Sequence, residues 1–106
     1  MPGAQVRVVV TRSARGDLDE IEEYWIARGE ADRGEKYFND LTDVAESQLG
    51  DMASAKRGRL YGAEHPGVRE ILAFGVYRII YEIDETALCV NVLRFWHAHR
   101  DEPPLQ

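Results

Sequence analysis

One continuous stretch, residues 68–100, constrains the fold of this chain more than any other part of the sequence. It reads VREILAFGVYRIIYEIDETALCVNVLRFWHAHR and is rich in Val, Ile, Leu, Tyr and Phe, which favour β-strands. Gly75 and the polar residues 84–86 interrupt the pattern at two turn positions. The stretch therefore predicts three strands in an antiparallel meander, over residues 68–74, 76–83 and 87–96.

The start of the chain predicts one further strand. Residues 5–11 read QVRVVVT, and their alternation places three residues on one face, Val6, Val8 and Val10. This strand reaches the meander only after a helical crossover. Residues 51–67 show no periodic pattern, and we expect a surface loop there with at most one helical turn.

Two helices are predicted between the first strand and this loop. Ser13 is a suitable N-cap for the first helix, and Gly29 is suited to closing it. A second helix is expected over residues 30–49 after a loop of one to three residues, so the two helices form an antiparallel hairpin. The inward face of the first helix is the stripe Ala14, Leu18, Ile21 and Trp25.

The first helix also carries a group of carboxylates, Asp17, Glu20, Glu22 and Glu23. Paired carboxylates can serve in acid–base chemistry. A solvated helix face is the more ordinary explanation for charges in a helix of this length. We therefore expect these side chains to face water.

The predicted order of elements is β-α-α-β-β-β in a single domain over residues 1–106. This order indicates an α+β fold of two layers, with the αα-hairpin packed on a four-stranded, mostly antiparallel sheet. Both faces of the predicted sheet are apolar, which favours a protein partner on the face without helices. The tail, residues 101–106, is expected to lack regular structure and to be mobile.

Charge and composition exclude several classes of protein. The formal net charge is −6, and residues 1–50 carry 6 basic and 11 acidic side chains. A general nucleic-acid binder needs an excess of positive charge, so stable direct binding of nucleic acid is not expected. No apolar run is long enough for a membrane span or a leader peptide, which predicts a cytoplasmic protein. The single cysteine, Cys89, excludes an internal disulfide and is expected to be buried, with a reactive thiol as the alternative.

No strong catalytic or metal motif is present. His97 and His99 supply only two close ligands where a metal site normally needs three or four, so no metal or cofactor is expected. Trp25 is expected in the core, and Trp96 is either a packing residue or an anchor for a partner.

The most informative group is a set of cationic side chains in the meander: Arg69, Arg78, Arg94, His97, His99 and Arg100. We expect Arg69 and the segment 97–100 to share one end of the sheet. Guanidinium groups stabilise phosphate charge and histidine moves protons, which is the minimum equipment for cleaving RNA without a metal. The alternative is that these charges pair with Glu70, Glu82 and Asp101.

Short motifs along nearly the whole chain resemble the ParE/RelE superfamily, the toxins of type II toxin–antitoxin modules, and its ParE branch in particular. The most specific combination is YRIIY at residues 77–81 followed by LRxxHxxR at residues 93–100. The other matching segments are AxxDLxxI at 14–21 with Tyr24-Trp25, Ala31 with FxxL at 38–41, and PGxR at 66–69. The fold of that family, β-α-α-β-β-β, agrees with the order derived above.

The resemblance implies a small cytoplasmic toxin that arrests growth, from a module of the kind that stabilises plasmids. It also implies a co-encoded, ParD-like antitoxin with a DNA-binding domain that neutralises the toxin. ParE-type members inhibit DNA gyrase and so block replication, whereas RelE-type members cleave mRNA on the ribosome. A third possibility is a non-toxic interaction module.

Two features of the sequence favour gyrase inhibition, and hence a protein that is not an enzyme. The chain has no tyrosine after Arg100, and it is acidic where a ribosome-bound nuclease is expected to be basic. For gyrase inhibition no catalytic residue is expected, and the candidate contacts with the target are Arg69, Arg94, Trp96, His97 and Arg100. For a metal-independent endoribonuclease the candidates are Arg69, Arg78 and His97.

Overall fold

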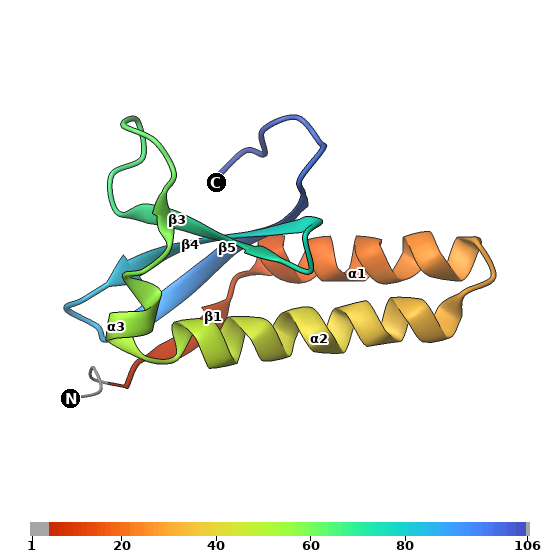
Figure 1. Ribbon diagram of the computed structural model, residues 1–106, viewed down its shortest axis with the longest axis horizontal. Helices are drawn as coiled ribbons and strands as arrows, with labels where there is room; N and C mark the ends of the chain where they lie inside the picture. The colour runs from red at the N-terminus through yellow and green to blue at the C-terminus, as the bar shows by residue number, and fades with distance from the viewer. Residues whose placement is uncertain (1–4, 106) are drawn as a thin grey trace.

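The computed structural model describes residues 5–105 and contains two layers, a helical hairpin on one side and a sheet on the other (Figure 1). The predicted α+β class and the packing of the hairpin on the sheet are confirmed. The elements in order are β1 (Arg7–Val10), α1 (Arg12–Ala27), α2 (Ala31–Leu49), α3 (Met52–Ala55), β2 (Arg59–Leu60), β3 (Val68–Ala73), β4 (Tyr77–Asp84) and β5 (Cys89–His97).

The sheet has five strands in the order β1-β5-β4-β3-β2, one more than predicted. β1 runs parallel to β5, and every other pair is antiparallel, as a meander requires. The additional strand is β2, which pairs Arg59 with Glu70 and Leu60 with Arg69. A strand of two residues has no alternation to detect, which is why it falls in the stretch predicted to be a loop. α3 is the single helical turn expected there.

The first helix begins earlier than its sequence pattern suggested. Thr11, not Ser13, is the N-cap, and its Oγ1 accepts a hydrogen bond from the backbone N–H of Ala14 at 3.3 Å. The same hydroxyl donates to the carbonyl of Val92 at 2.8 Å. Thr11 therefore directly follows β1, caps α1 and ties the start of the helix to β5.

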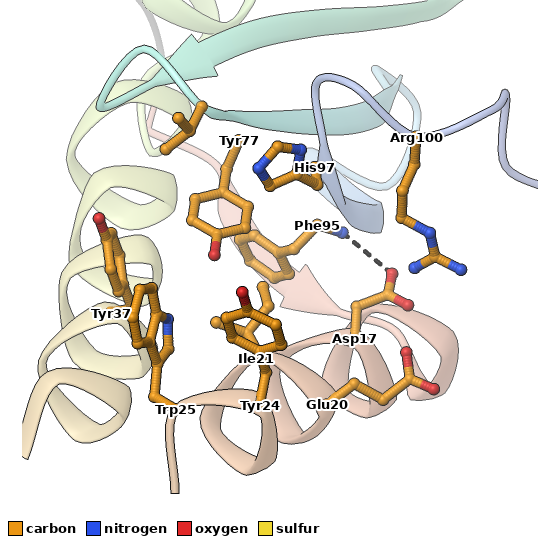
Figure 2. A pocket seen from close by; sticks show the side chains of 11 residues that line it. Asp17, Glu20, Ile21, Tyr24, Trp25, Tyr37, Tyr77, Phe95, His97 and Arg100 are labelled. Carbon is orange, nitrogen blue, oxygen red and sulfur yellow. Dashed lines mark hydrogen bonds between the residues drawn. The ribbon is translucent and has the colours of Figure 1, made fainter. Parts of the chain in front are cut away.

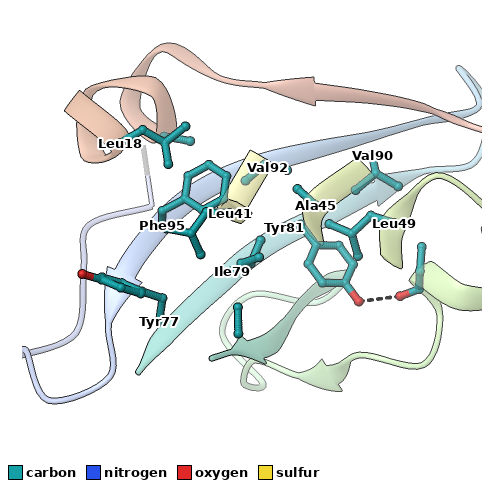
Figure 3. Packing of buried hydrophobic residues seen from close by; sticks show 13 residues of the cluster. Leu18, Leu41, Ala45, Leu49, Tyr77, Ile79, Tyr81, Val90, Val92 and Phe95 are labelled. Carbon is teal, nitrogen blue, oxygen red and sulfur yellow. Dashed lines mark hydrogen bonds between the residues drawn. The ribbon is translucent and has the colours of Figure 1, made fainter. Parts of the chain in front are cut away.

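The main core lies between the helical hairpin and one face of the sheet, as Figure 3 shows. Gly34 lets the two helices approach, because a Cβ there would lie 2.8 Å from the carbonyl oxygen of Glu22. Near α3, the Tyr81 hydroxyl donates to the carbonyl of Ala55 at 2.5 Å, which satisfies a buried polar group. The largest fully buried side chains are Leu18, Leu41, Leu49, Ile79, Ile80, Tyr81, Val90, Val92 and Phe95.

The prediction that Asp17 faces water is wrong. Its side chain is 4% exposed, and its carboxylate accepts hydrogen bonds from Arg94 Nε at 2.8 Å and Arg94 Nη2 at 2.7 Å. It also accepts one from the backbone N–H of Phe95 at 3.1 Å. The cause lies in the sheet: β1 ends at Val10, opposite Val92, so the edge of β5 beyond that point has no partner strand. Asp17 fills this place, whereas Glu20 and Glu23 on the same helix are exposed.

The close approach of Gly58 to Tyr81 gives a first prediction. A Cβ at residue 58 would lie 1.9 Å from the Tyr81 hydroxyl oxygen, and 2.8 Å from the ring carbon that bears it. We expect Gly58→Ala to lower the free energy of unfolding by about 1–3 kcal/mol, the usual cost of overpacking. Gly62→Ala is the matched control, because nothing lies within 4 Å of a Cβ at that position. Equal unfolding midpoints for the two variants in urea would contradict the prediction.

The buried Asp17–Arg94 pair gives a second prediction. Asp17→Asn leaves the Arg94 guanidinium, whose side chain is only 14% exposed, without its counter-charge, so we expect a loss of about 3–5 kcal/mol in the free energy of unfolding. Asp19→Asn is the control on the same helix, because Asp19 is exposed and 3.9 Å from Arg15. Exposed ion pairs contribute about 0–1 kcal/mol, so the control should unfold almost like the unchanged chain. The free energy of unfolding of both variants is measured by chemical denaturation, monitored by circular dichroism. A loss below 1 kcal/mol for Asp17→Asn would show that the Asp17–Arg94 pair does not stabilise the fold.

Candidate functional site

A cavity of about 540 Å³ lies where the end of β5 meets the two long helices. Figure 2 shows the aromatic rings and the charged groups around it. The turn that leads from β3 to β4 closes one side. The lining residues are Asp17, Glu20, Ile21, Tyr24, Trp25, Tyr37, Val76, Tyr77, Phe95, His97 and Arg100.

Aromatic contacts hold the walls of this cavity in place. The ring of Trp25 stacks on Tyr37 with centroids 5.8 Å apart, and Tyr37 meets Tyr77 edge-on at 5.4 Å. Trp25, which was predicted to lie in the core, is instead half-buried on the wall of the cavity and packs on Tyr37 of the second helix. Burial raises the pKa of the Tyr77 hydroxyl above its ordinary value, so Tyr77 stays neutral near pH 7. The cavity is apolar in its depth and charged at its mouth, where Glu20 and Arg100 lie (Figure 2).

His97 is a wall of the cavity and the last residue of β5. Its ring meets Tyr77 edge-on at 5.6 Å, and its Nδ1 accepts the backbone N–H of His99 at 3.1 Å. This bond assigns Nδ1 as the acceptor and Nε2 as the protonated nitrogen of the neutral ring. Within residues 5–105 no group of three or more His, Cys, Asp or Glu side chains is placed to hold a metal ion.

Trp96 and Arg94 point to the other side of β5 and have partners within the protein. Trp96 is 6% exposed, and its ring packs against the guanidinium groups of Arg94, at 4.6 Å, and Arg100, at 3.8 Å. Trp96 was predicted to be either a packing residue or an anchor for a partner, and its burial and internal contacts agree with packing. The guanidinium of Arg94 forms an ion pair with Asp17. Arg100, by contrast, is exposed and lies at the edge where both sides of the sheet meet.

The prediction that Arg69 shares an end of the sheet with residues 97–100 is wrong. Arg69 is paired with Tyr81 and His97 with Tyr77, four residues apart on β4, or roughly 13 Å along the strand. A meander reverses direction twice, so β3 and β5 run the same way and the start of β3 lies beside the start of β5. Arg69 Nη1 instead donates to the carbonyl of Gly58 at 2.7 Å.

Arg78 lies on the opposite side of the sheet from the cavity. Its Nε donates to Glu70 Oε1 at 2.7 Å, and its terminal nitrogens donate to Glu102 at 3.0 and 3.2 Å. Glu70 is 7% exposed, and although burial opposes its charge, the hydrogen bonds from Arg78 and Arg59 hold the pKa of its carboxyl below the ordinary value. The same contact with Glu70 raises the pKa of Arg78, which stays charged.

The alternative that these cations pair with carboxylates is therefore confirmed for Glu70 but not for the other two carboxylates named. Glu82 and Asp101 make no ion pair among the described residues, and Asp101 contributes a backbone carbonyl instead. The partners that the sequence analysis missed are Asp17 and Glu102. A carboxylate inside an apolar helix stripe was the available signal for Asp17, whereas Glu102, 24 residues from Arg78, leaves no local pattern.

None of the described helices is both long and apolar enough to cross a membrane.

Comparison with known proteins agrees with this fold. A chain from the chromosomal ParDE toxin–antitoxin system of P. aeruginosa superposes with a TM-score of 0.70 at 21% identity, over 88% of this chain and 96% of that one. A chain of the RelBE2 toxin–antitoxin complex from Mycobacterium tuberculosis gives 0.67 at 22% identity, over 89% and 99%. A search of curated protein sequences found no match.

The sequence itself matches a family model over residues 8–102, from β1 to the start of the tail. The model describes the ParE toxin of the type II toxin–antitoxin system parDE. The match spans both layers of the fold, including α1, the whole meander and the 97–100 segment. The chain therefore belongs to the family of ParE toxins of type II toxin–antitoxin systems.

Proposed function

We propose that this toxin arrests growth by inhibiting DNA gyrase, as a binding protein and not as an enzyme, and that a cognate antitoxin neutralises it in the cytoplasm. The observation that carries the proposal is the dispersal of the three candidate nuclease residues. Arg69 and His97 lie at opposite ends of the helix-facing side of the sheet, and Arg78 lies on the other side. The family match over residues 8–102 supports the same conclusion.

Metal-independent cleavage of RNA needs positive charge at the scissile phosphate and a proton-transfer group within hydrogen-bond reach of it. The guanidinium of Arg78 is already matched by two carboxylates, from Glu70 and Glu102. The Arg69 guanidinium is bound to a backbone carbonyl. Neither of the two candidate arginines, Arg69 and Arg78, therefore lies beside His97, and the net charge of −6 also opposes binding to ribosomal RNA.

The surface that we assign to the target is the end of β5 around His97 and Arg100. Arg100 offers an exposed cation there, and the cavity beside it offers an apolar recess. The ring of Trp96 packs against Arg100, and both Trp96 and Arg94 have hydrogen-bond partners within the protein. Arg69 lies too far along the sheet to belong to the same contact.

An antitoxin, ParD-like and carrying a DNA-binding domain, is the proposed partner for the remaining apolar surface. The two solved relatives are chains of toxin–antitoxin systems. Large apolar side chains are exposed on α1 and around the β3–β4 turn, namely Tyr24, Ile26, Leu72 and Phe74. Covering such a surface is the usual role of a binding partner.

The third prediction distinguishes inhibition of gyrase from cleavage of mRNA by two assays run in parallel. Purified toxin is expected to block supercoiling by gyrase at micromolar concentration or to trap cleaved DNA. Primer extension on cellular mRNA after induction is expected to show intact messages. Codon-positioned cuts that disappear in His97→Ala, with supercoiling unaffected, would replace the proposal with the ribosome-dependent nuclease. Normal growth on expression without antitoxin would instead indicate a non-toxic interaction module.

The role of Arg100 gives the fourth prediction. Arg100→Glu reverses an exposed charge at the proposed contact, so we expect inhibition of gyrase to weaken at least tenfold, a loss of about 1.4 kcal/mol. Arg57→Glu is the matched control, because Arg57 is also exposed, lies between α3 and β2, and makes no side-chain ion pair among the described residues. Equal inhibition by the two variants would remove Arg100 from the contact.

A further inference from the structure

The C-terminal tail, residues 101–105, lies on the side of the sheet away from the helices (Figure 1). We call this side the open face, and the side chains that define it are Val68, Glu70, Arg78, Ile80, Arg94 and Trp96. The tail has no helix or strand. Almost every residue of the tail nevertheless contacts the open face.

Glu102 makes the charged contact between the tail and the open face. Both terminal nitrogens of Arg78 donate to its carboxylate, and the Tyr61 hydroxyl donates to the same group. The guanidinium of Arg78 also lies 5.7 Å from the ring centroid of Tyr61. Burial and the bond to Glu102 raise the pKa of Tyr61 to about 12. Arg78 and Tyr61 thus form a receptor for one carboxylate, in the bidentate geometry that arginine favours.

Two further donors of the open face hold the backbone of the tail. Trp96 Nε1 donates to the carbonyl of Asp101 at 2.6 Å, and Arg94 Nη1 donates to the carbonyl of Pro104 at 2.9 Å. In these contacts the tail only accepts hydrogen bonds. Prolines suit such a segment because they have no N–H to leave unsatisfied and hold an extended backbone.

The apolar part of the tail completes the fit. Pro103 is buried, and Leu105 packs on a small cluster formed by Val68, Ile80 and Trp96. This cluster is separate from the main core and lies on the open face. The face therefore recognises an acidic residue, an extended proline segment and an aliphatic residue three positions after the acid.

The receptor side of this contact is built without the tail. Arg78 is positioned by Glu70, and Arg94 is positioned by Asp17. The tail side is loosely held, because the Glu102 side chain is 67% exposed and exposed ion pairs are weak. A weak contact made within one chain still forms, since the effective concentration of a tethered segment is on the order of millimolar.

We infer that the open face is a binding site for an acidic, proline-containing peptide segment of a partner protein, and that the chain's own tail occupies it as an internal competitor. The chemistry of the partner is that of the tail: a carboxylate for Arg78 and Tyr61, an acceptor-rich extended backbone for Trp96 and Arg94, and an aliphatic side chain for the Val68–Ile80–Trp96 cluster. This assignment is independent of the gyrase proposal, because it concerns the opposite side of the sheet from the cavity.

The test uses the full chain and substitutes a single tail residue, so that the tail is released from the open face. Glu102→Lys places a cation against Arg78, whereas Asp101→Lys makes the same charge change at a side chain with no ion pair among residues 5–105. The probe is the fluorescently labelled peptide DEPPLQ. We expect it to bind Glu102→Lys at least about tenfold more tightly than the unchanged chain or Asp101→Lys, because the internal competitor has been removed. The peptide DQPPLQ keeps the aspartate but lacks the carboxylate that corresponds to Glu102, and it should lose this binding.

A spectroscopic readout accompanies the binding measurement. The chain has two tryptophans, so their indole N–H resonances are readily assigned. In Glu102→Lys the Trp96 resonance should shift because its bond to Asp101 is released, and added DEPPLQ should reverse the shift while Trp25 stays unchanged. Equal affinity for all three chains, or no binding to Glu102→Lys with a released Trp96, would overturn the inference. So would a dimer of unchanged chains that dissociates in Glu102→Lys, because the tail would then belong to a second copy.

Discussion

The arrangement of this protein depends on one buried carboxylate, that of Asp17. The parallel pairing of β1 with β5 stops at Val92, and the chain then turns into α1. From that point β5 has an edge without a strand, and Asp17 accepts the N–H of Phe95 that a strand would have bonded. It also accepts two hydrogen bonds from Arg94. One side chain thus replaces a segment of backbone and fixes where the helix lies on the sheet.

The Asp17–Arg94 pair is the first of a series of contacts that connects the helical layer to the tail. Arg94, held by Asp17, lies against the ring of Trp96, and Trp96 in turn donates to the carbonyl of Asp101. The helical layer, the sheet and the tail are joined by these three side chains. A buried ion pair is costly to desolvate unless its remaining hydrogen-bonding groups are satisfied. Here the carboxylate has three donors, whereas Arg15 and Asp19 on the surface meet only at 3.9 Å. The buried pair therefore specifies one geometry that the exposed pair does not.

Much of the fold is predictable from the sequence because it depends on local periodicity. The alternation of residues 76–83 and the helical stripe through Leu18 predict the faces that form the core. What escaped prediction depends on pairings between distant residues. β2 has only two residues, and Asp17 meets a partner 77 residues away. The placement of Arg69 beside His97 failed for a different reason: the strand directions in a meander were sufficient to exclude it.

The cluster of charged and aromatic residues at the end of β5 is contiguous in sequence but divided in space. Successive residues of a strand point to opposite sides of the sheet, so His97 lies in the cavity while Trp96 packs under the tail. The strand therefore divides this cluster between the cavity side and the open face of the sheet. Arg100 follows the end of the strand and is free of this alternation. It contacts the Trp96 ring on one side and lines the cavity mouth on the other. The cavity and the open face, which the alternation of the strand keeps apart, therefore meet at Arg100.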